Sequence, residues 1–167
     1  TEFNEDELNY LKESLKGDFE WKLINRLKVQ AYVVKVNDKS TSQSQEKIRK
    51  AGANITKSLN EFKQKEVAVY DKTKGEVFLA SISEGMALAN YQFLKYFKDA
   101  KKKTNTLESI YTQSKSIPKE QLLELNAIVE ATFWARDLVN EPVSFLNAEE
   151  LSNQIEEMGK KGNFKVE

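Results

Sequence analysis

The residues Ser83-Glu84-Gly85 stand at the start of a strongly apolar helical pattern. Backbone N–H groups converge at the start of a helix, and such a position can hold a phosphate group. One glycine without a glycine-rich loop is a weak phosphate signal, and the carboxylate of Glu84 would repel an anion. We therefore interpret Ser83 as the N-cap of a helix over residues 83–97, with Glu84 near the positive end of its dipole.

A second stretch is basic, because Lys98 and residues 101–103 are all lysines, and Tyr96 and Phe97 precede them. Lysines beside aromatic rings can bind single-stranded nucleic acid. The cluster has no arginine, and no second basic patch accompanies it to build a groove. We therefore predict a solvated loop over residues 99–105 and do not expect nucleic acid as a partner.

The charged side chains near the C-terminus do not form a catalytic group. Arg136 and Asp137 are adjacent and do not share a helix face, and Glu141 lies five residues from Arg136, which is also poorly placed for a pair. We therefore interpret the three as interface or capping charges. The pairs at residues 149–150 and 156–157 are glutamates of a helix surface, with no sign of a shared proton or metal. We expect no catalytic, cofactor-binding or metal-binding residue in the chain.

The composition excludes several classes of chemistry. The chain has neither Cys nor His, which excludes disulfides, thiol nucleophiles, Cys/His zinc sites and Ser-His-Asp triads. Acidic and basic residues balance at 26 each, so the chain as a whole has no electrostatic attraction to nucleic acid or to an anionic membrane. Its apolar runs are far shorter than the roughly 18 residues of a membrane span. We expect a cytoplasmic protein without membrane contact.

Helical and strand patterns alternate along the chain, which indicates an α/β sandwich with a sheet between helix layers. One apolar stripe recurs at three- and four-residue steps and predicts a helix with one buried face; its members are Ile48, Ala51, Ile55, Leu59 and Phe62. Gly52 lies beside this stripe, and we expect it to allow close packing against a sheet, at a cost of about 1 kcal/mol relative to Ala. Residues 18–27 are mixed, and residues 77–80 are a short strand or the beginning of a helix. The predicted helices cover residues 5–15, 48–62, 83–97, 118–139 and 148–162, and the predicted strands cover residues 29–36, 67–70, 107–112 and the stretch from 164 onward.

The longest helical pattern ends in a joint over residues 134–142. Pro118 suits the first turn of this helix, and Pro142 stops it because a residue before proline is pushed away from helical geometry. Asn147 with Glu150 then resembles a capping box that begins another helix. The long helix is apolar on two sides, so we expect the chain to be part of something larger and to self-associate through this surface when isolated.

Three segments resemble the leucyl aminopeptidases, the two-metal cytosolic exopeptidase family. Residues 135–142, ARDLVNEP, and the segment from Phe145 to Glu167 are similar to that family's junction segment. Residues 48–53, IRKAGA, resemble the start of an earlier helix, and the resemblance covers roughly residues 45–167. A family helix of the form Glu-Gly-x-x-Leu-x-x-Tyr-x-Phe-x-x-Tyr is matched by Glu84, Gly85, Leu88, Tyr91, Phe93 and Tyr96.

This resemblance implies a three-layer α/β/α, macro-domain-like fold with a mixed sheet. Residues 1–116 would form a non-catalytic N-terminal domain, residues 117–142 a linker helix, and residues 143–167 the truncated beginning of a catalytic domain. The parent would release leucine-type N-terminal residues from peptides with two divalent metals, zinc or manganese, held by segments beyond Glu167. It would form hexamers through its catalytic domains, and this domain would serve assembly or regulation.

The chain departs from the family pattern in two places. Asn37 and Asp38 stand where the family often has glycines, and the first 28 residues show no opening strand. Two other functions remain open on the sequence. One is a stand-alone macro-type module that binds ADP-ribose or another nucleotide. Such a module needs a phosphate-binding loop, and the chain has only six glycines with which to build one. The other is nucleic-acid binding through the lysine loop.

Overall fold

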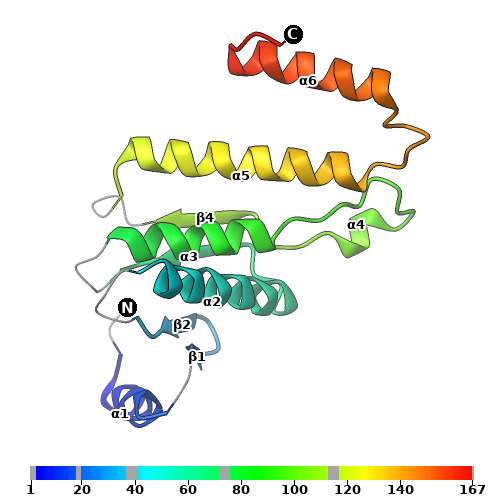
Figure 1. Cartoon of the computed structure of the whole chain (residues 1–167). Helices are drawn as coiled ribbons and strands as arrows, with labels where there is room; N and C mark the ends of the chain where they lie inside the picture. The colour runs from blue at the N-terminus through cyan, green and yellow to red at the C-terminus, as the bar shows by residue number, and fades with distance from the viewer. Residues whose placement is uncertain (1–2, 18–19, 37–40, 72–75, 113–116, 167) are drawn as a thin grey trace. The chain divides into compact units, whose positions relative to one another are not determined.

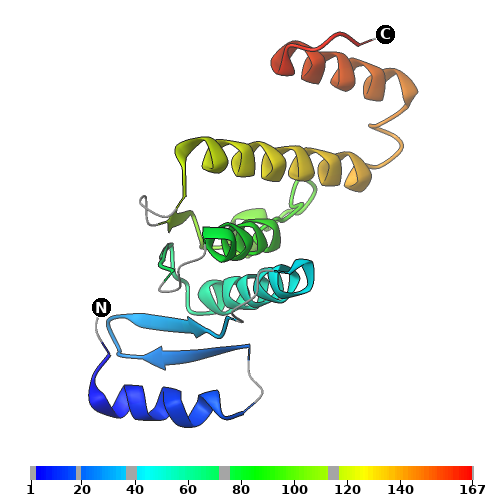
Figure 2. The same ribbon diagram turned by 60° about the vertical axis from the view of Figure 1, so that its left-hand side comes forward.

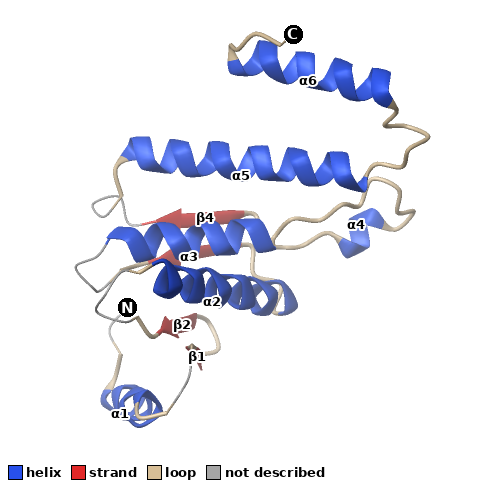
Figure 3. Cartoon of the chain, viewed as in Figure 1, coloured by secondary structure: helices blue, strands red, loops and turns tan. Residues whose placement is uncertain are grey.

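The structure is a computed structural model that describes residues 3–17, 20–36, 41–71, 76–112 and 117–166 (Figure 1). The chain divides into two compact units, residues 1–129 and 130–167, and the division falls inside the long helix α5. Helices and strands alternate along the described chain (Figure 3). They are α1 Glu5–Leu15, β1 Trp21–Asn25, β2 Gln30–Val34, α2 Ser42–Glu61, β3 Glu66–Val69, α3 Glu76–Ala89, α4 Ala100–Lys103, β4 Ser109–Thr112, α5 Lys119–Asn140 and α6 Ala148–Gly162.

The strands pair in both directions, so the α/β class is confirmed. β1 and β2 form an antiparallel hairpin in which Leu23 lies opposite Tyr32. β3 and β4 are parallel, with Val67 opposite Ile110, and α3 makes the crossover that a parallel pair requires. In the described part of the chain these are two separate two-stranded sheets. The expectation that the first 28 residues hold no strand is wrong, because β1 lies there.

The core of the first unit is a layer of two helices covered by both sheets. α2 and α3 pack against each other, α2 also lies against β2, and α3 lies against β4. The predicted stripe of α2 is confirmed at Ile48, Ala51, Ile55 and Leu59, which are all buried. Phe62 is instead the C-cap residue and is 47% exposed. The strand residues that pack on the helix core are Trp21, Tyr32, Val34, Val36, Val67, Val69 and Ile110.

The hairpin has a helix on each side, as Figure 2 shows for α1 and α2. Successive side chains of a strand point to opposite faces, so Ile24 faces away from the side that Trp21 presents to α2 and α3. Ile24 and Leu11 of α1 are buried, and both lie outside the main core cluster. The predicted helix over residues 5–15 is confirmed, although Leu8 is 41% exposed. This part of the chain therefore has the order helix, sheet, helix.

The helix predicted over residues 83–97 is displaced, because α3 covers Glu76–Ala89. Residues 77–80 belong to its first turns, which resolves the choice between strand and helix. Ser83 is not an N-cap: it is a buried mid-helix residue whose hydroxyl donates to the Leu79 carbonyl at 2.8 Å. The apolar residues after Ala89 imitate a continuing helix in the sequence, but the side chain of Asn90 is bound to the chain before β4 and the helix ends there.

The second unit contains α6, whose start is confirmed at Asn147. The side chain of Asn147 accepts a hydrogen bond from the Glu150 backbone N–H at 2.9 Å. The helix ends at Gly162, and Asn163 caps it in the left-handed conformation with φ 53°. Residues 164–166 do not begin a strand, because the Phe164 N–H turns back to the Gly159 carbonyl at 3.0 Å.

The long helix α5 ends at Asn140, two residues before Pro142, as predicted. Asn37 and Asp38, where the chain departs from the family pattern, lie outside the described residues. In the described part of the chain, no helix combines the length and the apolar character that a membrane crossing needs.

Candidate functional site

Glu84 and Gly85 lie at a contact between two helices, and this excludes the phosphate-binding interpretation for them. Both residues sit in the interior of α3, where backbone N–H groups are engaged within the helix. The carboxylate of Glu84 accepts from Arg49 Nε of α2 at 2.6 Å, and the two side chains are 23% and 32% exposed. A Cβ added to Gly85 would lie 2.1 Å from the Arg49 carbonyl oxygen. The Arg49–Glu84 ion pair and Gly85 therefore both serve the close packing of α3 against α2.

Gly52 completes the same contact from the side of α2. A Cβ added there would lie 2.5 Å from the carbonyl oxygen of Ile82 in α3. The expectation of close packing at Gly52 is confirmed, but its neighbour is a helix and not a sheet. Residues 48–53 and the segment that begins at Glu84, which the resemblance singled out separately, are thus the two sides of one helix pair.

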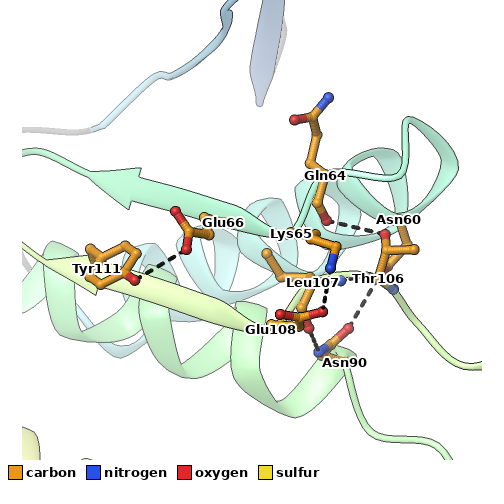
Figure 4. A network of polar contacts seen from close by, with 9 residues as sticks. All are labelled: Asn60, Gln64, Lys65, Glu66, Asn90, Thr106, Leu107, Glu108 and Tyr111. Carbon is orange, nitrogen blue, oxygen red and sulfur yellow. Dashed lines mark hydrogen bonds and ion pairs between the residues drawn. The ribbon is translucent and has the colours of Figure 1, made fainter.

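A network of amide side chains joins the end of α2 to the segment before β4 (Figure 4). Asn60 Oδ1 accepts from the backbone N–H groups of Thr106 at 2.7 Å and Leu107 at 3.0 Å. Asn60 Nδ2 donates to the Thr56 carbonyl and to Asn90 Oδ1, both at 3.0 Å. The oxygen and the nitrogen of the Asn60 amide thus both bond within the protein. The side chain therefore holds the end of α2 to the segment before β4, and its role is structural and not ligand binding.

Asn90 and Lys65 extend the network to the strands. Asn90 Nδ2 donates to the Leu107 carbonyl at 2.8 Å. The Lys65 carbonyl accepts from the Glu108 and Ser109 N–H groups at 2.7 and 3.1 Å, and the Lys65 ammonium lies 3.2 Å from the Glu108 carboxylate. These bonds place the start of β4 beside β3. The sequence did not indicate the network, because the side-chain bonds that join Asn60 and Asn90 to the segment before β4 span 17 to 47 residues.

An ion pair ties α1 to the turn after β1. Arg26 donates through Nε and Nη2 to the two carboxylate oxygens of Glu7. Glu7 also accepts from the Asn4 N–H at 2.9 Å and so completes a capping box at the start of α1. Hydrogen bonds from the Arg26 guanidinium hold the pKa of Glu7 below its ordinary value. The role of the pair is structural, and sequence reasoning missed it because the residues are 19 positions apart.

The structure does bring the predicted basic and aromatic residues together. The stretch over residues 99–105 is not simply a loop, because it contains the short helix α4. Lys103 Nζ lies 4.5 Å from the centre of the Phe97 ring and 3.3 Å from the Asp99 carboxylate. The side chains of Lys98 and Lys101–Lys103 are exposed. This exposed cluster is the one candidate binding surface that the sequence named and the structure assembles.

The other charged residues lie on or next to the last two helices. Arg136 and Asp137 are on α5, Glu141 follows its end, and the glutamates at positions 149, 150, 156 and 157 are exposed on α6. Across residues 3–166, with the gaps given above, the acidic side chains form no group of three that could hold a metal ion. The absence of catalytic, cofactor and metal residues from this chain stays a prediction.

Solved structures place this fold among domains that larger enzymes carry. A tomato leucine aminopeptidase mutant superposes with a TM-score of 0.71 at 15% identity, covering 93% of this chain and 34% of that one. The bottromycin maturation enzyme BotP in complex with Mn gives a TM-score of 0.65 at 19% identity, covering 90% of this chain and 33% of that one. At such identities the likeness shows the fold alone, so the chain has the α/β fold of about a third of these two proteins.

The sequence matches then define the family. Residues 38–101 match the model of the cytosol aminopeptidase family, N-terminal domain. A probable cytosol aminopeptidase of Clostridium perfringens is 30% identical over 138 residues, covering 77% of this chain and 28% of the relative. A probable cytosol aminopeptidase of Fusobacterium nucleatum is 38% identical over 86 residues, covering 52% of this chain and 17% of the relative. The chain carries an N-terminal domain of the cytosol aminopeptidase family, which confirms the resemblance read from its sequence.

Proposed function

We propose that the chain is the non-catalytic N-terminal part of a metal-dependent aminopeptidase that releases leucine-type residues from the N-termini of peptides. The observation that carries the proposal is the match of residues 38–101 to the family's N-terminal domain. The chain spans little more than a quarter of the Clostridium relatives that it matches, 28% and 27% of their lengths. The hydrolytic activity therefore belongs to the parent protein.

We assign the two divalent metals, zinc or manganese, to the parent's catalytic domain. The solved structure of BotP in complex with Mn supports a metal of this kind. The described residues of this chain do not fit a two-metal centre, since their carboxylates form no ligand group. When bound in the parent, such metals activate a water molecule for attack on the peptide bond. The residues of this chain contribute no step to that chemistry.

The long helix α5 is the proposed connection between this domain and the catalytic domain. Its described side chains include none that are buried, and Leu123 and Val139 are 58% and 85% exposed. Val143, directly after Pro142, is 83% exposed. Apolar surface of this kind is usual where another domain packs. We keep the domain boundaries at 1–116, 117–142 and 143–167, with the parent's own catalytic domain as the partner of the last two segments.

We further propose a cytoplasmic, homo-hexameric parent in which this domain serves assembly or regulation. The name of the relatives, cytosol aminopeptidase, supports the location. The alternative of a stand-alone module for ADP-ribose receives no support from the matches. The glycines at positions 52 and 85, moreover, are used for helix packing and not in a phosphate loop.

Two preparations test the proposal. The 167-residue chain alone is expected to hydrolyse leucine p-nitroanilide no faster than buffer, with or without Mn²⁺ or Zn²⁺. A chimera in which residues 1–142 replace the matching segment of the Clostridium perfringens relative is expected to hydrolyse it in a metal-dependent manner. Metal-dependent turnover by the purified 167-residue chain would contradict the proposal, as would a folded, metal-loaded chimera without turnover.

A further inference from the structure

The segment over residues 95–103, here called the basic patch, concentrates positive charge in a short exposed stretch of the chain. It contains five lysines and one acidic residue, whereas the whole chain is balanced at a formal net charge of zero. The side chains of residues 95–99 and 101–103 are all exposed. Such a local excess of one sign in a neutral chain attracts ligands of the opposite sign over about 10 Å at moderate salt.

Contacts among its own side chains and hydrogen bonds from Gln92 hold the basic patch in place. Lys103 is fixed between the Asp99 carboxylate, 3.3 Å away, and the face of the Phe97 ring, 4.5 Å from its centre. Gln92 Nε2 donates to the Lys103 carbonyl at 3.0 Å, and Gln92 Oε1 accepts from the Asn105 N–H at 2.6 Å. Because these bonds order the backbone in the free protein, a ligand would lose less conformational entropy on binding here than on a flexible lysine tail.

The basic patch is also joined to the core of the domain. Asn105 Nδ2 donates to the backbone carbonyl of Asn90 at 3.1 Å, and Asn90 belongs to the amide network that clamps α2 and β4. Lys98, Lys101 and Lys102 therefore project from a segment whose two ends are attached to packed elements. Each ammonium offers three donors to an acceptor such as a carboxylate.

We propose that the basic patch docks an acidic segment of another protein, one with several Asp or Glu residues in succession. Charge complementarity supplies the attraction, and the exposed ammonium groups of Lys98 and Lys101–Lys103 offer several donors within six positions of the sequence. This proposal rests on the geometry of residues 90–105 and holds whether or not the parent is an aminopeptidase.

Single-stranded nucleic acid fits the basic patch less well. Its binding depends on open aromatic faces for base stacking. Here Lys103 lies over Phe97, and Lys95 Nζ lies 5.5 Å from the centre of the Tyr96 ring, so a cation already engages one face of each ring. Arginine, which pairs with phosphate through two parallel bonds, does not occur in the segment. A carboxylate can approach the outer donors of the ammonium groups without disturbing either ring contact.

Fluorescence anisotropy with three probes of equal dye label tests the proposal on the whole 167-residue chain. The probes are a hexaglutamate peptide, a hexaglutamine peptide and an oligothymidine of six nucleotides. We expect saturable binding of hexaglutamate, weakened strongly when the salt concentration rises from about 0.05 to about 0.5 M. We expect no saturable binding of hexaglutamine and weaker binding of the oligothymidine.

A pair of variants with the same charge change locates the binding. The triple variant K98Q/K101Q/K102Q is expected to weaken hexaglutamate binding about tenfold, since each exposed ion pair contributes a fraction of that factor. The control K57Q/K119Q/K161Q removes three lysines that are exposed elsewhere and is expected to change the affinity less than about twofold. Equal circular dichroism spectra would show that both variants fold.

Three outcomes would overturn the proposal. One is the absence of saturable hexaglutamate binding by the unaltered chain at low salt. Another is an equal loss of affinity in the two triple variants, which would indicate attraction by overall charge. The third is tighter binding of the oligothymidine than of hexaglutamate with the same dependence on Lys98, Lys101 and Lys102, which would assign the surface to nucleic acid instead.

Discussion

Single polar side chains in this domain join elements that are distant in the sequence. Glu7 holds the start of α1 and receives Arg26 from the turn after β1. Asn60 holds the segment before β4 through two backbone N–H groups. Each residue also lies at the end of a helix, Glu7 in the capping box of α1 and Asn60 in the last turn of α2. Their bonds across the fold are what make them important for stability.

At Glu7 we predict a pH-dependent contribution to stability. The folded pKa of Glu7 is lowered by Arg26, so the ionised form stabilises the fold. This contribution is fully present above the unfolded pKa of about 4.3 and is lost as the pH falls through the lower folded pKa. Glu7→Gln should therefore reduce the urea midpoint at about pH 7, and the difference from the unaltered chain should shrink below about pH 4.

The matched control for this change is Glu13→Gln on the same helix. Glu13 pairs with Lys16 at 2.7 Å, but the two side chains are 71% and 72% exposed. A solvent-exposed pair within one helix contributes little, so the urea midpoint of this variant should stay close to that of the unaltered chain at both pH values. An equal effect of the two substitutions would show that the contact with Arg26 does not matter.

At Asn60 we predict a large loss from Asn60→Ala. The substitution leaves the N–H groups of Thr106 and Leu107 without their acceptor, and it removes the bond to Asn90. Unpaired, partly buried groups of this kind should lower the free energy of unfolding by about 2–3 kcal/mol, measured by urea unfolding. Asn126→Ala, at an exposed position of α5, should change it by less than about 0.5 kcal/mol. Similar losses at the two sites would argue against the network.

At the scale of elements, α2 and α3 pack closely against each other. Gly52 and Gly85 allow each backbone to approach the other, and Arg49 with Glu84 fixes the alignment. Side chains of the same helices form the core on which both sheets rest. Bulk introduced between the helices must therefore disturb the sheets as well.

For this pair we predict that Gly85→Ala destabilises the domain. The new Cβ would lie 2.1 Å from the carbonyl oxygen and 2.6 Å from the Cα of Arg49, which are backbone atoms that cannot rotate away. The free energy of unfolding should fall by about 3 kcal/mol in urea unfolding monitored by circular dichroism. Gly17→Ala is the control, because among the described residues its Cβ would meet only the Ser14 carbonyl oxygen, at 3.4 Å. The control should be neutral or stabilising by about 0.5 kcal/mol.

At the scale of the whole molecule, the apolar surface of α5 and the residues after it should govern association. We predict that the isolated chain self-associates as its concentration rises, and that L123Q/V139Q reduces this tendency, measured as the mean mass in light scattering. The reason is that both side chains are more than half exposed, at 58% and 85%. A monomeric mass for the unaltered chain at high concentration would contradict the prediction.

The control for this experiment removes a leucine and a valine from another surface. Leu27 and Val29 are 97% and 49% exposed in the turn between β1 and β2. The variant L27Q/V29Q should associate as much as the unaltered chain. If it loses association to the same degree as L123Q/V139Q, exposed apolar area in general and not the surface of α5 drives the process.

The sequence alone determined the features that depend on neighbouring residues. The stripe of α2, the stop of α5 before Pro142, the cap at Asn147 and the α/β class all follow from local periodicity and backbone restrictions, and the structure has each of them. The segments that indicated the family are also short stretches of the sequence. These predictions succeeded because their physical causes act within one or two helical turns.

Only the tertiary structure decided what the motif residues do. Ser83, Glu84 and Gly85 have the composition of a helix start, but burial of the preceding segment against α2 places them in mid-helix at a helix contact. Gly52 meets a helix and not a sheet for the same reason. No local pattern indicated a role for Asn60 and Asn90, whose side chains hold the segment before β4 in the fold. Long-range packing overrides local preference here because the buried apolar area and the paired backbone groups outweigh a single cap.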